Sequence, residues 1–190
     1  VICDVGVGRG GTWNEEGMIL FNSVNDGPLL RVSATGGTPA PFTTVDTAQG
    51  ENSHRWPQFL PGGRRFLYFV RTANVENSGV YVGSLDKPRE KALLLRSPTN
   101  AIYAPDRGKP VGHLLWVLDG TLMAQPFDPE QDQTTGEPAK VAEKVAFGSL
   151  TRLGAVSASN DGTLVYDGDG IRQFQFTWYD RDGKQGSGVG

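Results

Sequence analysis

The chain has 190 residues, a formal net charge of −3 and 37% hydrophobic residues. This length supports one sizeable hydrophobic core, and the slightly acidic charge balance argues against nucleic acid as the main partner. No apolar run approaches the ~20 residues that span a bilayer, so the sequence predicts no membrane insertion by this segment. The start shows no signal-peptide pattern, and the single cysteine, Cys3, excludes an internal disulfide and a cysteine-based zinc site.

The composition favours short strands joined by tight turns. The chain holds 26 glycines and 12 prolines, about a fifth of its residues against an average of about 12%. These residues fall between short apolar runs, a pattern that is typical of an all-β protein.

The first eleven residues, VICDVGVGRGG, have the pattern of a strand followed by G-x-G-x-x-G, the motif of dinucleotide-binding enzymes. That motif binds phosphate where a helix begins at the glycines, because the helix N-terminus supplies the N–H groups. Here a turn at residues 12–17 and an apolar strand at residues 18–21 follow instead. We therefore expect a strand at residues 1–5, then a glycine-rich loop, and no nucleotide cofactor.

Four segments share one plan: a short stretch ends at a glycine turn, and a dense apolar strand that ends in an aromatic residue follows. The turn glycines are Gly17, Gly63, Gly112 and Gly162, and the aromatic residues are Phe21, Phe69, Trp116 and Tyr166. The aromatic residues recur about every 48 residues, within the range of propeller blades. The sequence therefore predicts an all-β β-propeller region of four four-stranded blades, with units at about 12–50, 54–98, 101–147 and 153–190.

Two further strands follow in each of the first three units, and one in the fourth. The second strands are LLRVSA, VYVGSL, LMAQPF and FTWYDR, and the third strands are PAPFTT, KALLLRS and AKVAEKV. Valines in residues 139–147 also have helical spacing, but the position in the repeat favours an outer strand. Asp-Gly pairs at 26–27, 119–120 and 161–162 supply residues that tolerate the positive φ of hairpin turns.

These repeats resemble a known family. HRWPQFLPGGRRFLYF and SASNDGTLVY are similar to the core of TolB-like, WD-like propeller repeats, and Pro61-Gly62-Gly63 stands where such repeats have Pro-Asp-Gly. GGTWNEEGMILF, DGTLMAQPFD and TWYDRDGK resemble the propeller regions attached to bacterial serine/threonine kinase-like proteins. The resemblance implies a binding or sensing module, with a periplasmic or other extracytoplasmic location favoured. No kinase motif is present in the chain.

The phase of the units leaves ring closure open. Residues 1–5 have the pattern of an outer strand, belonging either to a preceding blade or to the fourth one. The chain can thus form a closed four-blade ring, a larger ring by self-association of two chains, or part of a larger ring. Unpaired blade edges are prone to aggregate, so some closure is expected.

Enzyme chemistry has little support in the residues. The two histidines, His54 and His113, fall at different phases of their units, and G-x-S-x-G is absent, so a Ser-His-Asp triad is not expected. The acidic residues Glu15 and Glu16 lie in a turn without the aromatic platform of a sugar site, and residues 128–130 do likewise. Solvated turns are the favoured interpretation, and the chain is expected to be no enzyme.

One pair of carboxylates has the spacing of a calcium loop. Asp167 and Asp169 stand at i and i+2, but residues 171–176 carry no later acid and a hairpin needs no ion. The pair is kept as a calcium candidate, and no other metal or cofactor is expected.

The positional hypothesis concerns the loops that lead into the innermost strands, since these gather around the central funnel of a propeller. They carry arginines, aromatic residues and a histidine: Arg9, Trp13, His54, Arg55, Trp56, Tyr103 and Arg152. Arginine and aromatic residues are enriched at binding hot spots. The alternative is that the aromatic residues pack between blades and the arginines are solvated.

The favoured function is a non-catalytic propeller module for protein or peptide binding or sensing, within a larger bacterial protein. One alternative is an accessory propeller of a peptidase or hydrolase whose catalytic domain lies elsewhere. Another alternative is a funnel that binds a small ligand or sugar.

Overall fold

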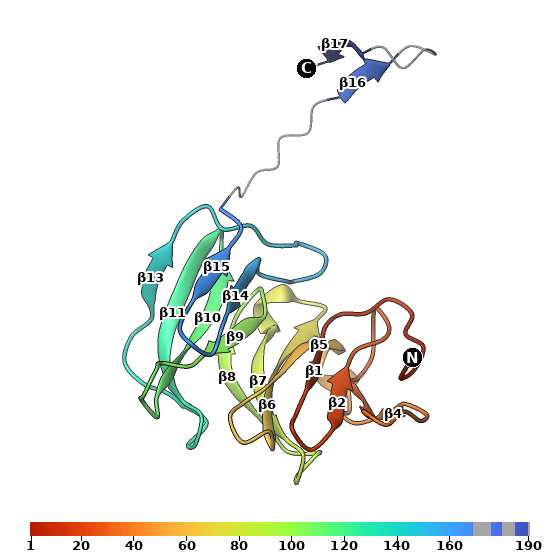
Figure 1. Cartoon of the computed structure of the whole chain (residues 1–190), viewed down its shortest axis with the longest axis vertical. Helices are drawn as coiled ribbons and strands as arrows, with labels where there is room; N and C mark the ends of the chain where they lie inside the picture. The colour runs from red at the N-terminus through yellow and green to blue at the C-terminus, as the bar shows by residue number, and fades with distance from the viewer. Residues whose placement is uncertain (169–175, 180–184, 190) are drawn as a thin grey trace.

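The computed structural model describes residues 1–168, 176–179 and 185–189. Its strands form antiparallel sheets that follow one another along the chain, with two short 3-10 helices in the connections, η1 (Thr47–Gln49) and η2 (Val75–Asn77). Figure 1 shows the first three sheets side by side, from red at the N-terminus to cyan.

The first sheet has four strands in sequential order. They are β1 (Gly11–Trp13), β2 (Met18–Phe21), β3 (Leu30–Ser33) and β4 (Ala40–Pro41). Asn14 closes the β1–β2 turn because its side-chain oxygen accepts a hydrogen bond from Met18 N at 2.8 Å. Gly17 adopts φ +77° in that turn, a conformation in which glycine carries no steric penalty.

The second sheet repeats this order with longer strands. They are β5 (Glu51–Phe59), β6 (Arg65–Thr72), β7 (Gly79–Ser84) and β8 (Lys91–Arg96). The register of β5 against β6 shifts twice, between Glu51 and Ser53 and between Arg55 and Gln58. These bulges change which way the β5 side chains point, and this change determines the site described below.

The third sheet holds five strands. They are β9 (Ala101–Ala104), β10 (Gly112–Leu118), β11 (Thr121–Asp128), β12 (Gln133–Thr134) and β13 (Ala139–Ala142). Both β12 and β13 pair with β11, so residues 139–142 form the outer strand that the repeat predicts. Asp119 and Gly120 both adopt positive φ, as the hairpin prediction for the Asp-Gly pair requires.

The last unit differs from the prediction. Strand β14 (Val156–Ala158) pairs with β15 (Leu164–Tyr166), whereas β16 (Phe176–Tyr179) pairs with β17 (Gln185–Val189). The segment FTWYDR was expected to be the strand next to β15, yet its described part, β16, has β17 as its hydrogen-bonded neighbour.

The sequence predicts that residues 1–5 are an outer strand of a preceding blade or of the fourth one. These residues form no strand in the structure. Residues 7–10 instead extend the β1–β2 pairing, since Val7 N donates to Ser23 O at 3.1 Å and Asn22 N donates to Gly10 O at 3.1 Å. The glycine-rich stretch therefore leads into a strand and not into a helix, as the sequence indicates.

The core lies between neighbouring sheets. One cluster joins the first and second sheets: Leu20, Leu29, Phe42, Phe66, Tyr68 and Val70. Another joins the second and third: Leu67, Phe69, Val80, Val82, Ala101, Tyr103, Leu114, Trp116 and Phe127. A third joins the third sheet to β14 and β15: Leu115, Val117, Leu122 and Val145, with Val156 and Leu164.

Alternation along the central strands produces this arrangement. In β6, Phe66, Tyr68 and Val70 face the first sheet, while Leu67 and Phe69 face the third sheet. Successive side chains of a strand point to opposite faces, so a strand covered on both faces must be apolar throughout. The dense apolar strands β6 and β10 therefore lie in sheets that have another sheet packed on each face.

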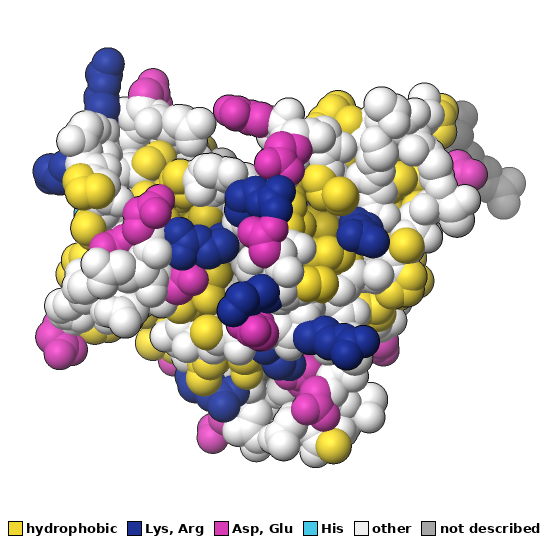
Figure 2. All heavy atoms as spheres, turned by 90° about the horizontal axis from the view of Figure 1, so that it is seen from below, with side chains coloured by type: hydrophobic (Ala, Val, Ile, Leu, Met, Phe, Trp, Pro, Cys, Tyr) yellow, Lys and Arg dark blue, Asp and Glu magenta, His cyan; other side chains and the backbone are white. Residues whose placement is uncertain are grey.

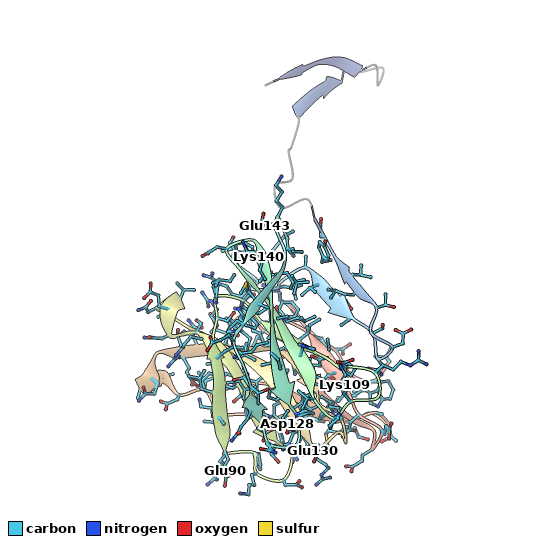
Figure 3. The ribbon with its side chains drawn as sticks, turned by 90° about the vertical axis from the view of Figure 1, so that its left-hand side faces the viewer. Glu90, Lys109, Asp128, Glu130, Lys140 and Glu143 are labelled. Carbon is cyan, nitrogen blue, oxygen red and sulfur yellow. The ribbon has the colours of Figure 1, made fainter. Side chains whose placement is uncertain are left out.

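The stack of sheets has two ends. The hairpin turns at 14–17, 60–64, 105–111 and 159–163 lie beyond the last residues of the inner strands β1, β5, β9 and β14, and we call this the turn end. The first residues of the same strands define the start end. In Figure 3, Glu90, Lys109, Asp128 and Glu130 lie toward the lower end of the sheets, and Lys140 and Glu143 lie toward the upper end.

Candidate functional site

The inner strands lie next to one another and run in the same direction. Trp56 N donates to Arg9 O at 2.8 Å, and three residues further along each chain segment Phe59 N donates to Thr12 Oγ1 at 3.0 Å. The Gln58 amide spans to β9, because Nε2 donates to Tyr103 O at 3.1 Å while Oε1 accepts from Tyr103 N at 2.7 Å. The starts of β1, β5 and β9 therefore gather at one end, as the funnel hypothesis expects.

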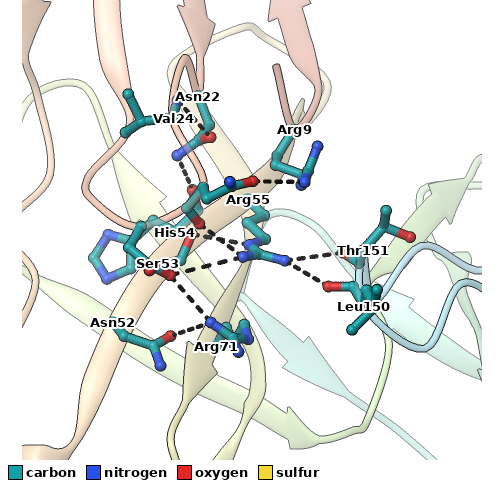
Figure 4. Close-up of polar contacts among 12 residues, drawn as sticks. Arg9, Asn22, Val24, Asn52, Ser53, His54, Arg55, Arg71, Leu150 and Thr151 are labelled. Carbon is teal, nitrogen blue, oxygen red and sulfur yellow. Dashed lines mark hydrogen bonds and ion pairs between the residues drawn. The ribbon is translucent and has the colours of Figure 1, made fainter. Parts of the chain in front are cut away.

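Arg55 joins three parts of the chain at the start end. Its side chain is only 3% exposed, and its guanidinium donates to Ser53 Oγ at 2.9 Å, Asn25 O at 2.7 Å and Leu150 O at 3.0 Å (Figure 4). These acceptors belong to the second unit, the first unit and the connection before β14. Arg55 thus holds the connecting loops together, and its donors are used within the protein.

Trp56 packs beside Arg55 in a strained conformation. Its φ is +53°, and its indole Nε1 donates to Thr151 O at 2.9 Å. A Cβ at Gly10 would lie 2.7 Å from Trp56 Cε3, closer than real Cβ contacts come. The glycine of the opening motif therefore makes room for an indole ring, which explains the motif without a phosphate.

Three further arginines surround Arg55. Burial, together with the neighbouring charges of Arg71, Arg9 and Arg152, lowers the pKa of Arg55 to about 10, and Asp26 opposes this shift. We call Arg9, Arg55, Arg71 and Arg152 the arginine cluster. The acid that faces it is Asp26, 66% exposed, whose Oδ1 lies 3.1 Å from Arg71 Nη1 and 4.0 Å from Arg55 Nη2. The cluster therefore carries more positive than negative charge.

Two members of the cluster keep free donor capacity. Arg9 Nη2 donates to Asn25 Oδ1 at 2.6 Å, but Arg9 Nε is buried and has no hydrogen-bond partner within the described residues. Arg152 is half-buried with φ +62°, and its carbonyl accepts from Asn100 N at 2.9 Å, which ties the starts of β9 and β14 together.

Trp13 and Tyr103 lie at the other end of the inner strands, away from the arginine cluster. Trp13 ends β1 and is 60% exposed, and Tyr103 is buried with its ring centroid 5.9 Å from that of Phe127. Both line a cavity of about 530 Å³ at the turn end, together with Gln58 and Asn160. The structure thus divides the predicted residues between two ends of one strand group.

His54 lies at neither end. Its side chain is 0% exposed and sits between the first and second sheets, with Nδ1 2.7 Å from Thr43 Oγ1 and Nε2 3.2 Å from Glu51 Oε2. Burial lowers the pKa of His54, although the Glu51 carboxylate opposes that shift. The imidazole is therefore a neutral, hydrogen-bonded core group, so the prediction that His54 is a funnel-face binding residue is wrong.

The sequence analysis missed Arg71 and the carbonyls that hold Arg55. Arg71 stands near the end of the apolar strand FLYFVRT, and this one charged residue after a buried run is the signal that could have found it. The identity of residues 150 and 151 does not indicate that their backbone carbonyls accept these hydrogen bonds. Backbone groups serve any side chain that reaches them.

The calcium candidate finds no support in the described part of the chain. Asp169 lies outside the described residues. The backbone of Asp167 is used in the sheet, since its N donates to Ala155 O at 3.0 Å and its O accepts from Ala146 N at 3.0 Å. Among the residues that the structure describes, no three His, Cys, Asp or Glu side chains gather closely enough to hold a metal ion.

Comparisons with known proteins bear on the fold. No family model matches the chain, and no curated protein matches it. The β-propeller domain of the Trilobed protease from Pyrococcus furiosus, described as having an open velcro topology, superposes with a TM-score of 0.51 at 10% identity. That match covers 73% of this chain and 44% of the other, so the chain spans less than half of the longer propeller.

A second solved structure is similar over more of the chain. The endo-arabinase from Bacteroides thetaiotaomicron VPI-5482 matches 93% of this chain and 67% of its own, with a TM-score of 0.46 and 15% identity. Within the described residues, no helix has the length and apolar character to cross a membrane. The stacked antiparallel sheets and the first likeness together confirm the predicted fold: the chain is an all-β region of the β-propeller type.

Proposed function

We propose that this chain is a non-catalytic propeller module that binds an acidic segment of a protein or peptide at the arginine cluster. The observation that carries the proposal is the charge imbalance at the start end, where four guanidinium groups face one exposed carboxylate. Arginine presents a planar fork of donors that matches a carboxylate.

The difference in burial between Arg55 and its neighbouring arginines supports this role. The Arg55 guanidinium donates to backbone carbonyls and so holds the connecting loops in place. Arg9 and Arg152 are half-buried and lie around it. A rigid base with partly exposed charges above it is a preorganised site, in which little side-chain freedom is lost on binding. Asp26, which is mostly exposed, is the group that an incoming carboxylate would replace.

Hexaglutamate is a suitable probe for the acidic segment. The expected result is saturable binding that weakens steeply as salt increases, since exposed charges are screened. Arg9→Gln and Arg152→Gln should each weaken binding by about tenfold, the effect of losing roughly 1.4 kcal/mol. Arg89→Gln is the matched control, because Arg89 is an exposed arginine in the β7–β8 turn.

Two results would overturn the proposal. One is equal binding of hexaglutamate and hexalysine. The other is an affinity for hexaglutamate that survives both Arg9→Gln and Arg152→Gln.

The setting of the module is also a proposal. The resemblance to TolB-like and kinase-attached propellers supports a place in a larger bacterial protein, at a periplasmic or other extracytoplasmic location. Fractionation of the source cells with an antibody to this region tests the location, and recovery with cytoplasmic markers would contradict it.

A second candidate function is an accessory propeller of a peptidase or hydrolase. Its support is the fold likeness to the propeller domain of the Trilobed protease. The reading frame that encodes this chain tests it: an α/β-hydrolase segment with G-x-S-x-G in the same frame supports this candidate. Further blades in its place support the binding module.

A further inference from the structure

The cavity at the turn end has a chemistry opposite to that of the arginine cluster. It has a volume of about 530 Å³ and lies where the hairpin turns of several units meet, with Trp13, Glu15, Glu16, Gln58, Tyr103 and Asn160 among its lining residues. We propose that this cavity binds an alkylammonium group, the chemistry of a lysine side chain or of a free aliphatic amine. The inference does not rest on the proposed role of the arginine cluster.

Two of the three amide side chains that line the cavity, those of Asn14 and Gln58, are already in use. Asn14 Nδ2 donates to Gly63 O at 2.8 Å, and its Oδ1 accepts from Met18 N at 2.8 Å. Gln58 is engaged at both ends by the backbone of Tyr103. Within the described residues, Asn160 is thus the one lining amide without a hydrogen bond, and it lies in a cavity that also carries the carboxylates of Glu15 and Glu16.

These carboxylates carry negative charge. Glu16 Oε2 lies 2.9 Å from Arg64 Nη1, and Arg64 also pairs with Asp86, so one cation serves two carboxylates. Glu15 makes no ion pair or hydrogen bond within the described residues. No lysine or arginine of the described chain lines the cavity. The cavity rim thus has an excess of carboxylate that a ligand cation would balance.

The rest of this face is charge-compensated. Figure 2 shows basic and acidic side chains interleaved over the turn end, with apolar side chains between them. Arg65 Nη1 lies 3.2 Å from Asp132 Oδ2, and Lys109 Nζ lies 2.6 Å from Asp106 Oδ2. Glu15 differs from these acids because its partner is missing within the described chain.

Trp13 supplies the second element of cation recognition. Its ring is 60% exposed at the end of β1, directly before the turn that carries Glu15. A tryptophan face attracts an ammonium group through the ring quadrupole, and an adjacent carboxylate adds Coulomb attraction. An exposed indole beside an unpaired carboxylate in a hollow therefore favours a cationic occupant over a neutral one.

The test is a titration of the isotope-labelled chain, followed by the Trp13 indole N–H resonance. The probes are Nα-acetyl-lysine methylamide, its norleucine counterpart, n-butylammonium and arabinose. The expected result is a saturable shift with the lysine probe and n-butylammonium, and none with the norleucine compound or arabinose. Tighter binding of the lysine probe than of n-butylammonium identifies a protein side chain as the source, and the reverse identifies a free amine.

Variants complete the test. Glu15→Gln and Trp13→Leu should each weaken binding of the lysine probe at least fivefold, measured by isothermal titration calorimetry because Trp13→Leu lacks the indole reporter, and unchanged melting curves should show that both variants fold. Glu90→Gln, which removes an exposed acid paired with Lys87, is the control and should bind as the parent does. Equal binding of the norleucine compound, a shift with arabinose alone, or full affinity in Glu15→Gln would overturn the proposal.

Discussion

At the residue scale, Thr43, His54 and Glu51 form a chain of hydrogen bonds between the first two sheets. Thr43 Oγ1 accepts a hydrogen bond from Leu29 N at 2.9 Å, so its own proton is free to reach His54 Nδ1. His54 Nε2–H then donates to Glu51, which Lys91 also holds. Each buried polar atom of this chain has a partner, which is the condition for burying it at low cost.

The ionisation of this network links stability to pH. Burial alone would raise the pKa of Glu51, but hydrogen bonds from His54, Lys91 and Asp46 N outweigh it and lower the pKa from 4.5 to about 2. The ionised Glu51 carboxylate thus stabilises the fold above pH 4.5, and this stabilisation is lost as the pH falls toward 2. Burial lowers the pKa of His54 below 6.5, so the unfolded chain binds this proton more readily, and acidification below pH 6.5 favours unfolding.

We therefore predict that the free energy of unfolding decreases from about pH 8 to about pH 5. His54→Gln should flatten this dependence because the titrating group is gone, and should cost about 1–3 kcal/mol at pH 8 through unpaired neighbours. Urea unfolding at several pH values measures both effects. His113→Gln, which lies outside the network, is the control and should keep the slope, whereas an unchanged slope in His54→Gln would refute the assignment.

At the element scale, the connection before β14 is held by side chains of β5. Arg55 donates to Leu150 O and Trp56 donates to Thr151 O, at a sequence separation of 95 residues each. Asn100 adds a third contact, because its Oδ1 accepts from Gly154 N at 2.9 Å. The start of the last unit is thus fixed by residues of the second and third units.

Arg55→Gln should release this connection. We predict faster amide hydrogen exchange at Arg152 and Gly154 and a loss of about 1.5–3 kcal/mol in stability, the range for hydrogen bonds to a charged group. Hydrogen-exchange mass spectrometry of residues 148–154 measures the release. Arg65→Gln is the control, since Arg65 pairs with Glu130 and Asp132 at the turn end. Protection at Gly154 that is equal in both variants would contradict the clamp.

Much of the fold is predictable from the sequence because burial on two faces leaves a clear pattern. The apolar runs that contain Phe69 and Trp116 lie in β6 and β10, and in the structure their side chains alternate between two neighbouring sheets. Residues 1–5 have a similar apolar pattern but form no strand, since a short apolar run does not reveal whether a partner strand is present. Strand pairing depends on residues far away in the sequence. For the same reason the sequence did not predict that β16 pairs with β17.

The candidate site was predictable in part. The cluster around Arg9, Arg55 and Arg152 follows from the expectation that strand starts gather at one end. The direction of His54, Arg55 and Trp56 depends on the bulge between Arg55 and Gln58. A one-residue change of register sends side chains to the opposite face, and no residue type announces it.

At the scale of the whole molecule, the stack of sheets has two outer faces that no described sheet covers. The outer face of the first sheet holds an apolar hollow of about 340 Å³, lined by residues that include Ile2, Val5, Ile19 and Val32. The last unit and the connection before it also expose apolar side chains to solvent, those of Leu150, Val165 and Tyr166. Val165 is 64% exposed. Exposed apolar patches of this kind mark interaction sites.

We therefore predict self-association of the isolated chain through these faces. Light scattering should give a mass that rises with concentration, and Val165→Glu should shift it toward the monomer because burying an unpaired charge is costly. Val75→Glu is the control, because Val75 lies in η2 and is less exposed than Val165, and it should leave the association unchanged. A monomeric mass at every concentration would contradict this prediction and favour closure within one chain.

The central claim is that inner strands of successive units lie side by side, so that distant residues share a start end and a turn end. Nuclear Overhauser contacts in solution test it most directly. The account predicts cross-peaks between the Gln58 side-chain amide and the Tyr103 backbone amide, and between Thr12 and the Phe59 amide. Absence of both, with contacts that instead place β4 beside β5 in one continuous sheet, would contradict it.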